Sequence, residues 1–141
     1  GRYHDTHREE LGWLIPLAQK VETVHGDHDD APLGLTAALV ALGDELTSHM
    51  MKEEQVLFPM MRQGGHPMIV HPIGRMREEH DTTVQLLKDI EHVTHALNLP
   101  EGACRSWQAL YAGLRKFSDD LVTHMHLENE VLFPRFETAS A

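Results

Sequence analysis

The amino-acid sequence predicts an all-α protein, folded as an antiparallel up-down-up-down bundle of four helices. Four segments carry apolar residues at steps of three and four, which is the period of a helix with one buried face. Short or moderate connections that contain glycine and proline separate these segments, so consecutive helices should run antiparallel. No segment shows the alternation of apolar and polar residues that is typical of a half-buried strand.

The first half of the chain contains two of the predicted helices. The first covers residues 2–25, and we expect a kink at Gly12 and Pro16. The second covers residues 33–62, and Pro59 should end or bend it. The buried stripe of this second helix is predicted to contain Leu35, Leu39, Leu42, Leu46, His49, Glu53, Val56 and Met60.

The second half contains the other two helices. A connection at residues 63–72 leads to the third helix, residues 73–97, and the fourth helix covers residues 103–133, where Pro134 should stop it. The stripe of the third helix is predicted to contain Ile73, Met76, His80, Thr83, Leu87, Ile90, Thr94 and Leu97. The stripe of the fourth is predicted to contain Trp107, Leu110, Leu114, Phe117, Leu121, His124, Glu128 and Val131.

Length, charge and cysteine content restrict the function classes. The 141 residues are enough for one domain with a buried core, which we place at residues 1–141. The net charge of −10 argues against nucleic acid as a partner, because phosphate binding needs a basic surface. The single cysteine, Cys104, excludes an intramolecular disulfide and a cysteine-based zinc or iron–sulfur motif within this chain.

The sequence contains no candidate membrane span and no secretory signal. A cytoplasmic protein without a membrane partner is therefore the default expectation. Gly1 lies only three residues before His4, so a helix that begins here would be cut short. We expect the chain to be a domain excised from a longer protein.

A repeat organises the sequence. Residues 49–59 read H-M-M-K-E-E-Q-V-L-F-P, and residues 124–134 read H-M-H-L-E-N-E-V-L-F-P, 75 positions later. Each copy is an H-x-x-x-E motif followed, after two residues, by V-L-F-P. A His-Asp-Thr triplet that begins at His4 returns at His80, 76 positions later. This layout predicts two similar helical hairpins that face each other across a metal centre.

The polar members of the stripes indicate metal chemistry. Residues four apart lie on the same helix face, so His49 and Glu53 can ligate one metal centre. A buried carboxylate is costly unless a cation accompanies it, and helical bundles build di-metal sites from such residues on facing helices. The same reasoning applies to His80, His124 and Glu128. Carboxylates and imidazoles without thiolates suit iron or manganese better than a structural zinc site.

The alternative is that these histidines are satisfied core or boundary residues and that the glutamates face solvent. Two copies in matched register, each preceded by a histidine 44–45 positions upstream, favour the metal centre over this alternative. Two further acidic residues, Glu45 and Glu79, have two interpretations. They are either ordinary surface charges or residues that line an acidic route to the metal or orient the ligand imidazoles.

The first helix offers three histidines near one face. The repeated His-Asp-Thr triplet favours His4, and His7, one turn away, is the alternative ligand or a supporting residue. His25 would lie about 31 Å from His4 along the helix axis, so the two cannot serve the same centre. For His25 we expect a role at the helix end or on the surface.

The segments that carry these motifs resemble the hemerythrin-like (HHE cation-binding) domain. More closely, they resemble the C-terminal domain of the iron–sulfur-cluster repair di-iron proteins, the RIC family. The resembling segments are residues 2–5, 48–54, 57–59, 79–81 and 124–134, which together extend over nearly the whole chain. The resemblance implies that the chain is the C-terminal part of a longer protein with a hemerythrin-like bundle.

The resemblance also implies a cofactor and a ligand set. The cofactor would be two non-haem iron ions with an oxo or hydroxo bridge. The terminal ligands would be His4, His49, His80 and His124, and the bridging ligands would be Glu53 and Glu128.

The chain departs from the resembling proteins at two points. Full-length members of the family carry an N-terminal domain with a vicinal cysteine pair, which this chain lacks. Oxygen-carrying hemerythrins use a second histidine one turn from the first on the third helix, whereas the positions one turn from His80 are Met76 and Val84. We therefore expect a more open centre than that of a simple oxygen carrier.

The resemblance implies a di-iron protein of the nitrosative and oxidative stress response, which aids repair of damaged iron–sulfur clusters as an iron donor and binds nitric oxide. Its partners would be iron–sulfur proteins as iron acceptors, and the small ligands NO and O₂. The alternative is an O₂- or NO-binding sensor or scavenger that retains its iron. A third interpretation is a redox enzyme that reduces NO, so enzymatic activity stays an open question.

Overall fold

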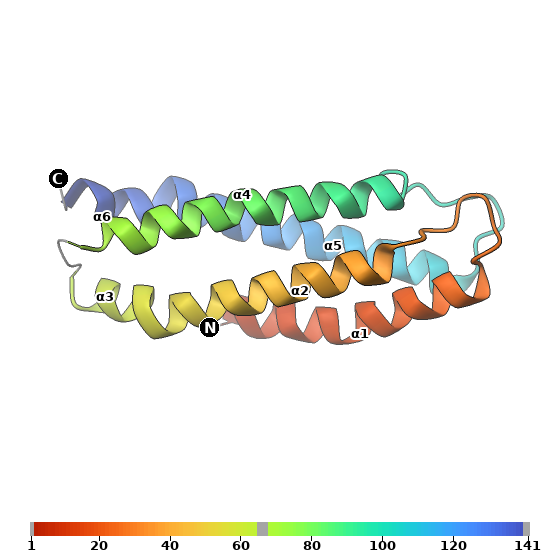
Figure 1. Ribbon diagram of the computed structural model, residues 1–141, viewed down its shortest axis with the longest axis horizontal. Coiled ribbons are helices and arrows are strands. Elements are labelled where there is room, and N and C mark those ends of the chain that lie inside the picture. Colours follow the sequence, from red (N-terminus) through yellow and green to blue (C-terminus); the bar gives the residue numbers. More distant parts are fainter. Residues whose placement is uncertain (1, 65–67, 140–141) are drawn as a thin grey trace.

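The computed structural model of the chain describes residues 2–64 and 68–139, with side chains for residues 5–64 and 68–136 (Figure 1). Four long helices span these ranges: α1 (Arg2–Val24), α2 (Leu35–Lys52), α4 (Val70–Val93) and α5 (Arg105–Leu127). Two helices are extended by a π-helical turn and a short α-helix. These extensions are η1 (Glu53–Leu57) and α3 (Phe58–Arg62) after α2, and η2 (Glu128–Leu132) and α6 (Phe133–Ala139) after α5.

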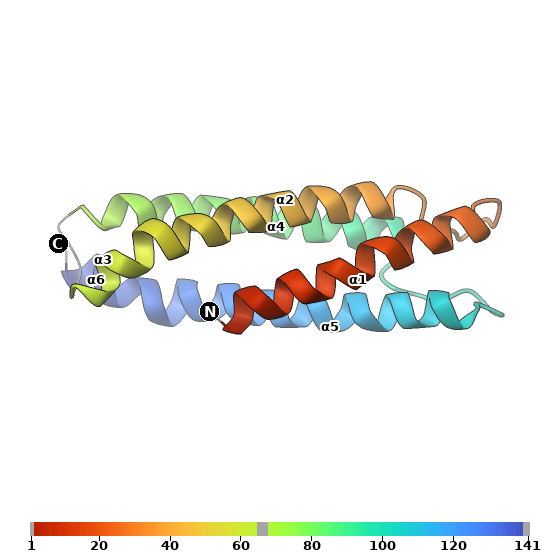
Figure 2. The same ribbon diagram turned by 90° about the horizontal axis from the view of Figure 1, so that it is seen from below.

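The four long helices run antiparallel in chain order (Figures 1 and 2). Helix α1 packs against α2 and α5, and α2 packs against α4. The α1–α2 and α4–α5 connections lie at one end of the bundle, and α3 and α6 lie at the other. The predicted all-α four-helix bundle is therefore confirmed, and the described residues contain no strand.

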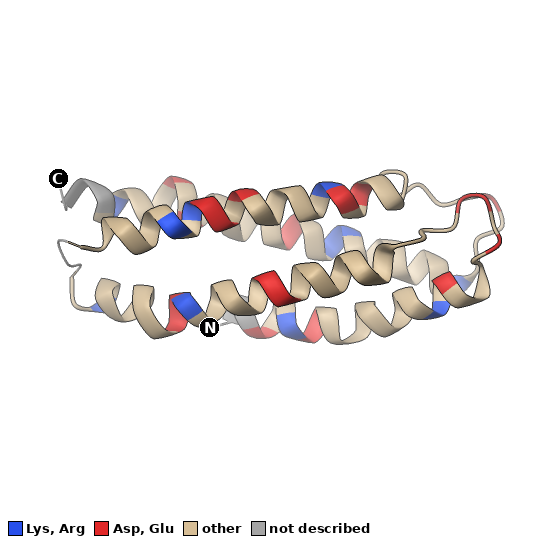
Figure 3. Cartoon of the chain, in the orientation of Figure 1, with Lys and Arg blue, Asp and Glu red and all other residues tan. Residues whose placement is uncertain are grey.

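Basic and acidic residues are spread along the long helices, and acidic residues gather in the α1–α2 connection (Figure 3). None of the helices in the described ranges is both long enough and apolar enough to cross a membrane.

A side chain from α1 fixes the start of α2. The Glu22 carboxylate accepts hydrogen bonds from the backbone N–H groups of Gly34, at 2.7 Å, and Thr36, at 2.9 Å, and from the Thr36 hydroxyl. Gly34 is the N-cap of α2 and Thr36 lies in its first turn, where backbone N–H groups have no partners within the helix. The contact therefore holds the first two helices in register along the bundle.

The apolar core consists of two clusters separated by a polar layer. The larger cluster fills the half of the bundle near the α1–α2 connection and includes Leu14, Leu39 and Trp107. The smaller cluster lies at the other end and includes Ile73 and Phe133. In α4 and where α2 and α5 pass into η1 and η2, buried polar residues lie close to the boundary between the two clusters. These polar residues include His49, Glu53, His80 and Glu128.

The π-helical turns explain where the predicted stripes were wrong. A strict α-helical period places Val56 and Val131 inside, but their side chains are 48% and 50% exposed. A π-turn uses about one residue more than an α-turn, so the helix face that is buried shifts by one position. Leu57, one position after Val56, is buried instead, and at the end of the second π-turn Leu132 is partly buried and Phe133 fully buried.

The two prolines of the repeat do not end their helices. Pro59 lies near the start of α3, which continues to Arg62, and Pro134 lies near the start of α6, which continues to Ala139. A proline is tolerated there because the first residues of a helix need no N–H donor within it. The prediction that Pro134 stops the fourth helix is therefore wrong.

The third helix also has different ends from those predicted. It begins at Val70 rather than residue 73 and ends at Val93 rather than residue 97. Residues 95–97 have φ values of 53°, 58° and 61°, a left-handed turn that terminates the helix. In the first helix, α1 is continuous through Pro16, and the kink expected there stays a prediction.

Candidate metal centre

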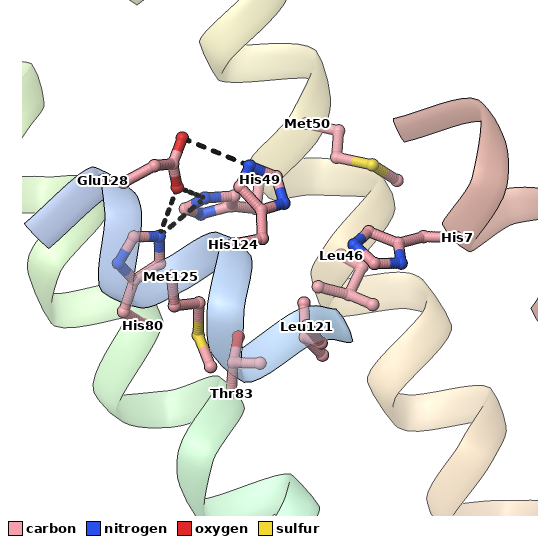
Figure 4. A pocket seen from close by; sticks show the side chains of 10 residues that line it. All are labelled: His7, Leu46, His49, Met50, His80, Thr83, Leu121, His124, Met125 and Glu128. Atoms are coloured by element: carbon pink, nitrogen blue, oxygen red, sulfur yellow. Dashed lines mark hydrogen bonds and ion pairs between the residues drawn. The ribbon is translucent and has the colours of Figure 1, made fainter. Parts of the chain in front are cut away.

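The two H-x-x-x-E motifs lie where α-helix changes to π-helix. His49 is in the last turn of α2 and Glu53 begins η1, while His124 is in the last turn of α5 and Glu128 begins η2. His80 comes from the middle of α4. Figure 4 shows His49, His80, His124 and Glu128 gathered around one buried pocket, with His7 of α1 facing them.

Four of the predicted ligands converge closely. The Nε2 atoms of His49 and His80 are 3.1 Å apart, and His80 Nε2 is 3.0 Å from Glu128 Oε1. His49 Nε2 also contacts the Glu53 carboxylate and lies 3.9 Å from Glu128 Oε1. One ligand atom from each of these four residues lies within 4.8 Å of the others, and all four side chains are buried.

The hydrogen bonding of His80 tests whether this cluster fits a cation. His80 Nδ1 lies 2.9 Å from the side-chain oxygen of Asn129, which can only accept a hydrogen bond. When Nδ1 donates its hydrogen to that oxygen, Nε2 carries a lone pair. That lone pair then faces the carboxylate of Glu128 and the Nε2 atom of His49. Three electron-rich atoms in a buried site favour a cation between them, so the donor set fits a metal ion.

The pKa values of the cluster show how strongly it favours positive charge. Burial on its own lowers the pKa of His49, but hydrogen bonds with Glu128 and Glu53 raise it to about 9. Burial on its own raises the pKa of Glu128, but hydrogen bonds with His124, His49 and His80 bring it well below its ordinary value. In the metal-free protein, a proton on His49 therefore partly compensates the buried carboxylates.

The second half of the centre lies toward α1. His124 Nε2 is 3.5 Å from Glu128 Oε2, so His124 faces the opposite oxygen of the carboxylate that contacts His80. The His7 ring stacks on the His124 ring, with centroids 5.7 Å apart and an angle of 19°. His7 Nδ1 also lies 4.0 Å from Glu10 Oε1. The side chain of His4, the favoured ligand from the first helix, lies outside the described residues.

His80 is supported by residues that the sequence did not predict as part of the site. Asn129 contacts its Nδ1 atom, and the His80 ring stacks on Phe133, with centroids 5.8 Å apart. The Arg77 guanidinium donates a hydrogen bond to the backbone carbonyl of Asn129, at 3.1 Å. The repeat places Asn129 at the position equivalent to Glu54, but the sequence carries no signal for its contact with His80.

Glu45 and Glu79 line one surface cleft beside the centre, together with Lys52 and Arg75. Glu79 is buried, and its two oxygens lie 3.1 Å from Lys52 Nζ and 3.7 Å from Arg75 Nε. Through its ion pair with Lys52, Glu79 of α4 is linked to α2, and it directly precedes His80. Glu79 is therefore a buried, paired residue and not an ordinary surface charge. The cleft carries basic as well as acidic groups, so it is not purely acidic.

His25 lies at the other end of the bundle. Its Nε2 atom is 3.1 Å from Cys104 Sγ, and its ring centroid is 5.0 Å from that of Trp107. This contact pins the end of α1 against the start of α5. His25 takes no part in the cluster of His49, Glu53, His80 and Glu128, as its distance along the helix predicted.

Several curated proteins are similar to this chain over most of its length. The chain is 50% identical over 134 residues to a probable iron–sulfur cluster repair protein of Haemophilus influenzae, a match that covers 95% of this chain and 60% of the relative. It is 51% identical to the iron–sulfur cluster repair protein YtfE of Yersinia pseudotuberculosis and 52% identical to that of Salmonella newport. Each of these two matches covers 95% of this chain and 61% of the relative. The chain thus spans about three fifths of the length of these relatives.

A family model matches almost the whole described chain. Residues 2–136 match the model of the hemerythrin HHE cation-binding domain. The match includes both H-x-x-x-E motifs and both His-Asp-Thr triplets. With the helical bundle and the buried cluster of imidazoles and carboxylates, it shows that the chain belongs to the hemerythrin HHE cation-binding domain family.

Proposed function

We propose that this domain holds two non-haem iron ions and donates iron during the repair of iron–sulfur clusters damaged by nitrosative or oxidative stress. The observation that carries the proposal is the buried convergence of His49, His80, Glu53 and Glu128. The process is suggested by the relatives, whose names describe iron–sulfur cluster repair. The proposed partners are iron–sulfur proteins as iron acceptors, together with NO and O₂ as small ligands.

The proposed ligand set divides between two ions. His49 and His80 would hold one iron, because their Nε2 atoms lie 3.1 Å apart. His124 and a histidine of α1 would hold the other. We propose His4 for this last position, and His7, whose ring stacks on His124, is the alternative. Glu53 and Glu128 would each contact both ions, since Glu128 already directs one oxygen toward His80 and the other toward His124.

The ligand types favour a site that can release its metal. Imidazole and carboxylate bind iron less permanently than a set of thiolates would, and the described cluster has no thiolate. When an ion leaves, His49 can take up a proton, because hydrogen bonds with the two glutamates raise its pKa to about 9. The buried carboxylates then retain a positive neighbour. The bound irons themselves would supply redox chemistry and open positions for diatomic ligands.

Iron content and iron transfer test the proposal directly. The purified protein, loaded anaerobically with Fe(II), should bind two irons per chain. It should then restore iron to a cluster-depleted acceptor protein supplied with sulfide. Less than one iron per chain would contradict the metal assignment. Two stably bound irons with no transfer would contradict the donor role alone.

A second candidate function is a sensor or scavenger that binds O₂ or NO and keeps its iron. This candidate is favoured by the position of Met76, which is buried one helical turn before His80. A histidine at this position would complete the coordination of the proposed iron, and methionine leaves that position open. An incomplete ligand set leaves a position for a diatomic molecule. Incubation of the loaded protein with a mild chelator and a cluster-depleted acceptor separates the candidates, because a sensor retains its iron whereas a donor loses it.

A further inference from the structure

The two halves of the repeat differ at the residue that follows the proposed bridging glutamate. In the first half this residue is Glu54, whose Oε1 atom pairs with Arg8 Nη2 at 3.5 Å. In the second half it is Asn129, whose side-chain oxygen lies 2.9 Å from His80 Nδ1. A carboxylate and a neutral amide therefore occupy equivalent positions on the two π-turns. The two residues differ in one ability, because the amide can donate a hydrogen bond as well as accept one, whereas the carboxylate can only accept.

Asn129 is held in place by its surroundings. Its backbone carbonyl accepts a hydrogen bond from Arg77 of α4, whose guanidinium also lies over the Phe133 ring, 5.5 Å from the centroid. The His80 ring stacks on the same Phe133 ring, and the angle between the two rings is 13°. The packing thus fixes Asn129 and His80 against each other across α4 and η2.

An amide can support either neutral form of an imidazole, whereas a carboxylate can support only one. With its oxygen toward His80, Asn129 accepts a hydrogen bond from Nδ1–H, and Nε2 is left free to bind a metal. With its NH₂ group toward His80, it donates to Nδ1, and Nε2 then carries the hydrogen. In that second form Nε2–H points at Glu128 Oε1, which is 3.0 Å away. A carboxylate has no hydrogen to donate and would accept only the first, metal-binding form.

We propose that Asn129 is a positioning residue for His80 that supports both the metal-bound and the metal-free imidazole, and so makes the His49–His80 side the readily exchanged side of the centre. A neutral metal-free imidazole can carry its one hydrogen on either ring nitrogen, and the amide can turn over to match either form. The inference deepens the proposed iron-donor function and rests on metal binding at His80.

The substitution Asn129→Asp keeps the size of the side chain and removes its ability to donate. It should hold His80 in the metal-binding form and slow Fe(II) release to a chelator about tenfold, in the phase that comes from this side. Val131→Asp is the matched control, because it adds the same charge to the same π-turn on an exposed side chain. Equal slowing in both variants would assign the effect to charge alone and overturn the proposal.

A second measurement does not depend on iron transfer. In the metal-free protein, ¹⁵N NMR of labelled histidine distinguishes Nδ1–H from Nε2–H. The wild-type His80 ring should show both forms, and the Asn129→Asp variant only Nδ1–H. Zn(II), a diamagnetic probe, should shift the wild-type ring to Nδ1–H. If the wild type and the variant show the same form in the metal-free protein, the proposal is wrong even when iron binds as expected. If iron does not bind but the metal-free forms differ and Zn(II) shifts the wild-type ring, the iron-donor function fails and the support of metal-bound His80 by Asn129 stands.

Discussion

The stability of the metal-free protein should fall as the pH rises through 9, and His49 supplies the reason. The pKa of this buried imidazole is raised from 6.5 to about 9 by hydrogen bonds with Glu128 and Glu53 that outweigh its burial. A raised pKa means that the folded protein binds the proton more tightly than the unfolded chain does. The contribution of His49 is therefore fully present below pH 6.5 and is lost as the pH rises through 9.

The gap between pKa values of 6.5 and about 9 corresponds to about 3 kcal/mol of stability. With a urea dependence of about 2 kcal/mol per M, the unfolding midpoint should be about 1.5 M lower at pH 9.5 than at pH 6.5. The lowered pKa of Glu128 does not offset this change, because its contribution is lost only as the pH falls below the ordinary value of 4.5.

Urea unfolding of the metal-free protein, followed by circular dichroism at both pH values, provides the assay. The variant His49→Gln is the control, because its amide can still donate to the glutamates but does not titrate. Between pH 6.5 and pH 9.5, the urea midpoint of this variant should fall by less than that of the wild type. The difference between the two shifts should be at least about 1 M, because the variant lacks the titrating imidazole. Equal pH dependence in the two proteins would refute the reasoning.

Three further predictions concern the centre and the packing around it. Loading the protein with Fe(II) below pH 9 should release the proton held by His49, so calorimetry in buffers of different ionisation enthalpy should detect about one proton from this site per chain. Glu53→Gln should weaken metal binding at least about tenfold while the fold is retained, as measured by competition with a chelator, and unchanged affinity would remove Glu53 from the ligand set. Gly113→Ala should destabilise the bundle by about 1–3 kcal/mol, because a Cβ atom there would collide with the Trp13 ring of α1. Replacing Trp13 by alanine in the same background should make the Gly113→Ala change cost less, as measured by thermal unfolding.

Most of the fold and part of the centre could be predicted because both rest on helical periodicity. His49 and Glu53 lie on one helix face by their spacing, and the second copy of the motif repeats this arrangement at His124 and Glu128. Periodicity could not reveal that the helix changes its period at Glu53. The buried positions beyond that point were consequently misassigned, as Val56 shows.

Contacts between helices account for what the sequence did not reveal. Asn129 supports His80 across the α4–η2 interface, and no spacing within one helix indicates such a contact. The pairing of His25 with Cys104 likewise joins segments 79 positions apart. His7 was recognised only as an alternative, because its stacking on His124 depends on how α1 lies against α5.

The two π-turns also determine which changes in length the chain can accept. Each wide turn absorbs about one residue, or about 100° of helical rotation, between the polar layer and the end of the bundle. Deleting one exposed residue from a turn, such as Gln55 or Glu130, would restore a regular α-helix and leave the residues beyond it on the same face. Leu57 would then lie three positions after Glu53, and Phe133 four positions after Glu128, so each would stay in the apolar cluster at that end. For protein engineering, these two segments should therefore tolerate a single-residue deletion better than the regular parts of the helices, where a deletion rotates everything beyond it.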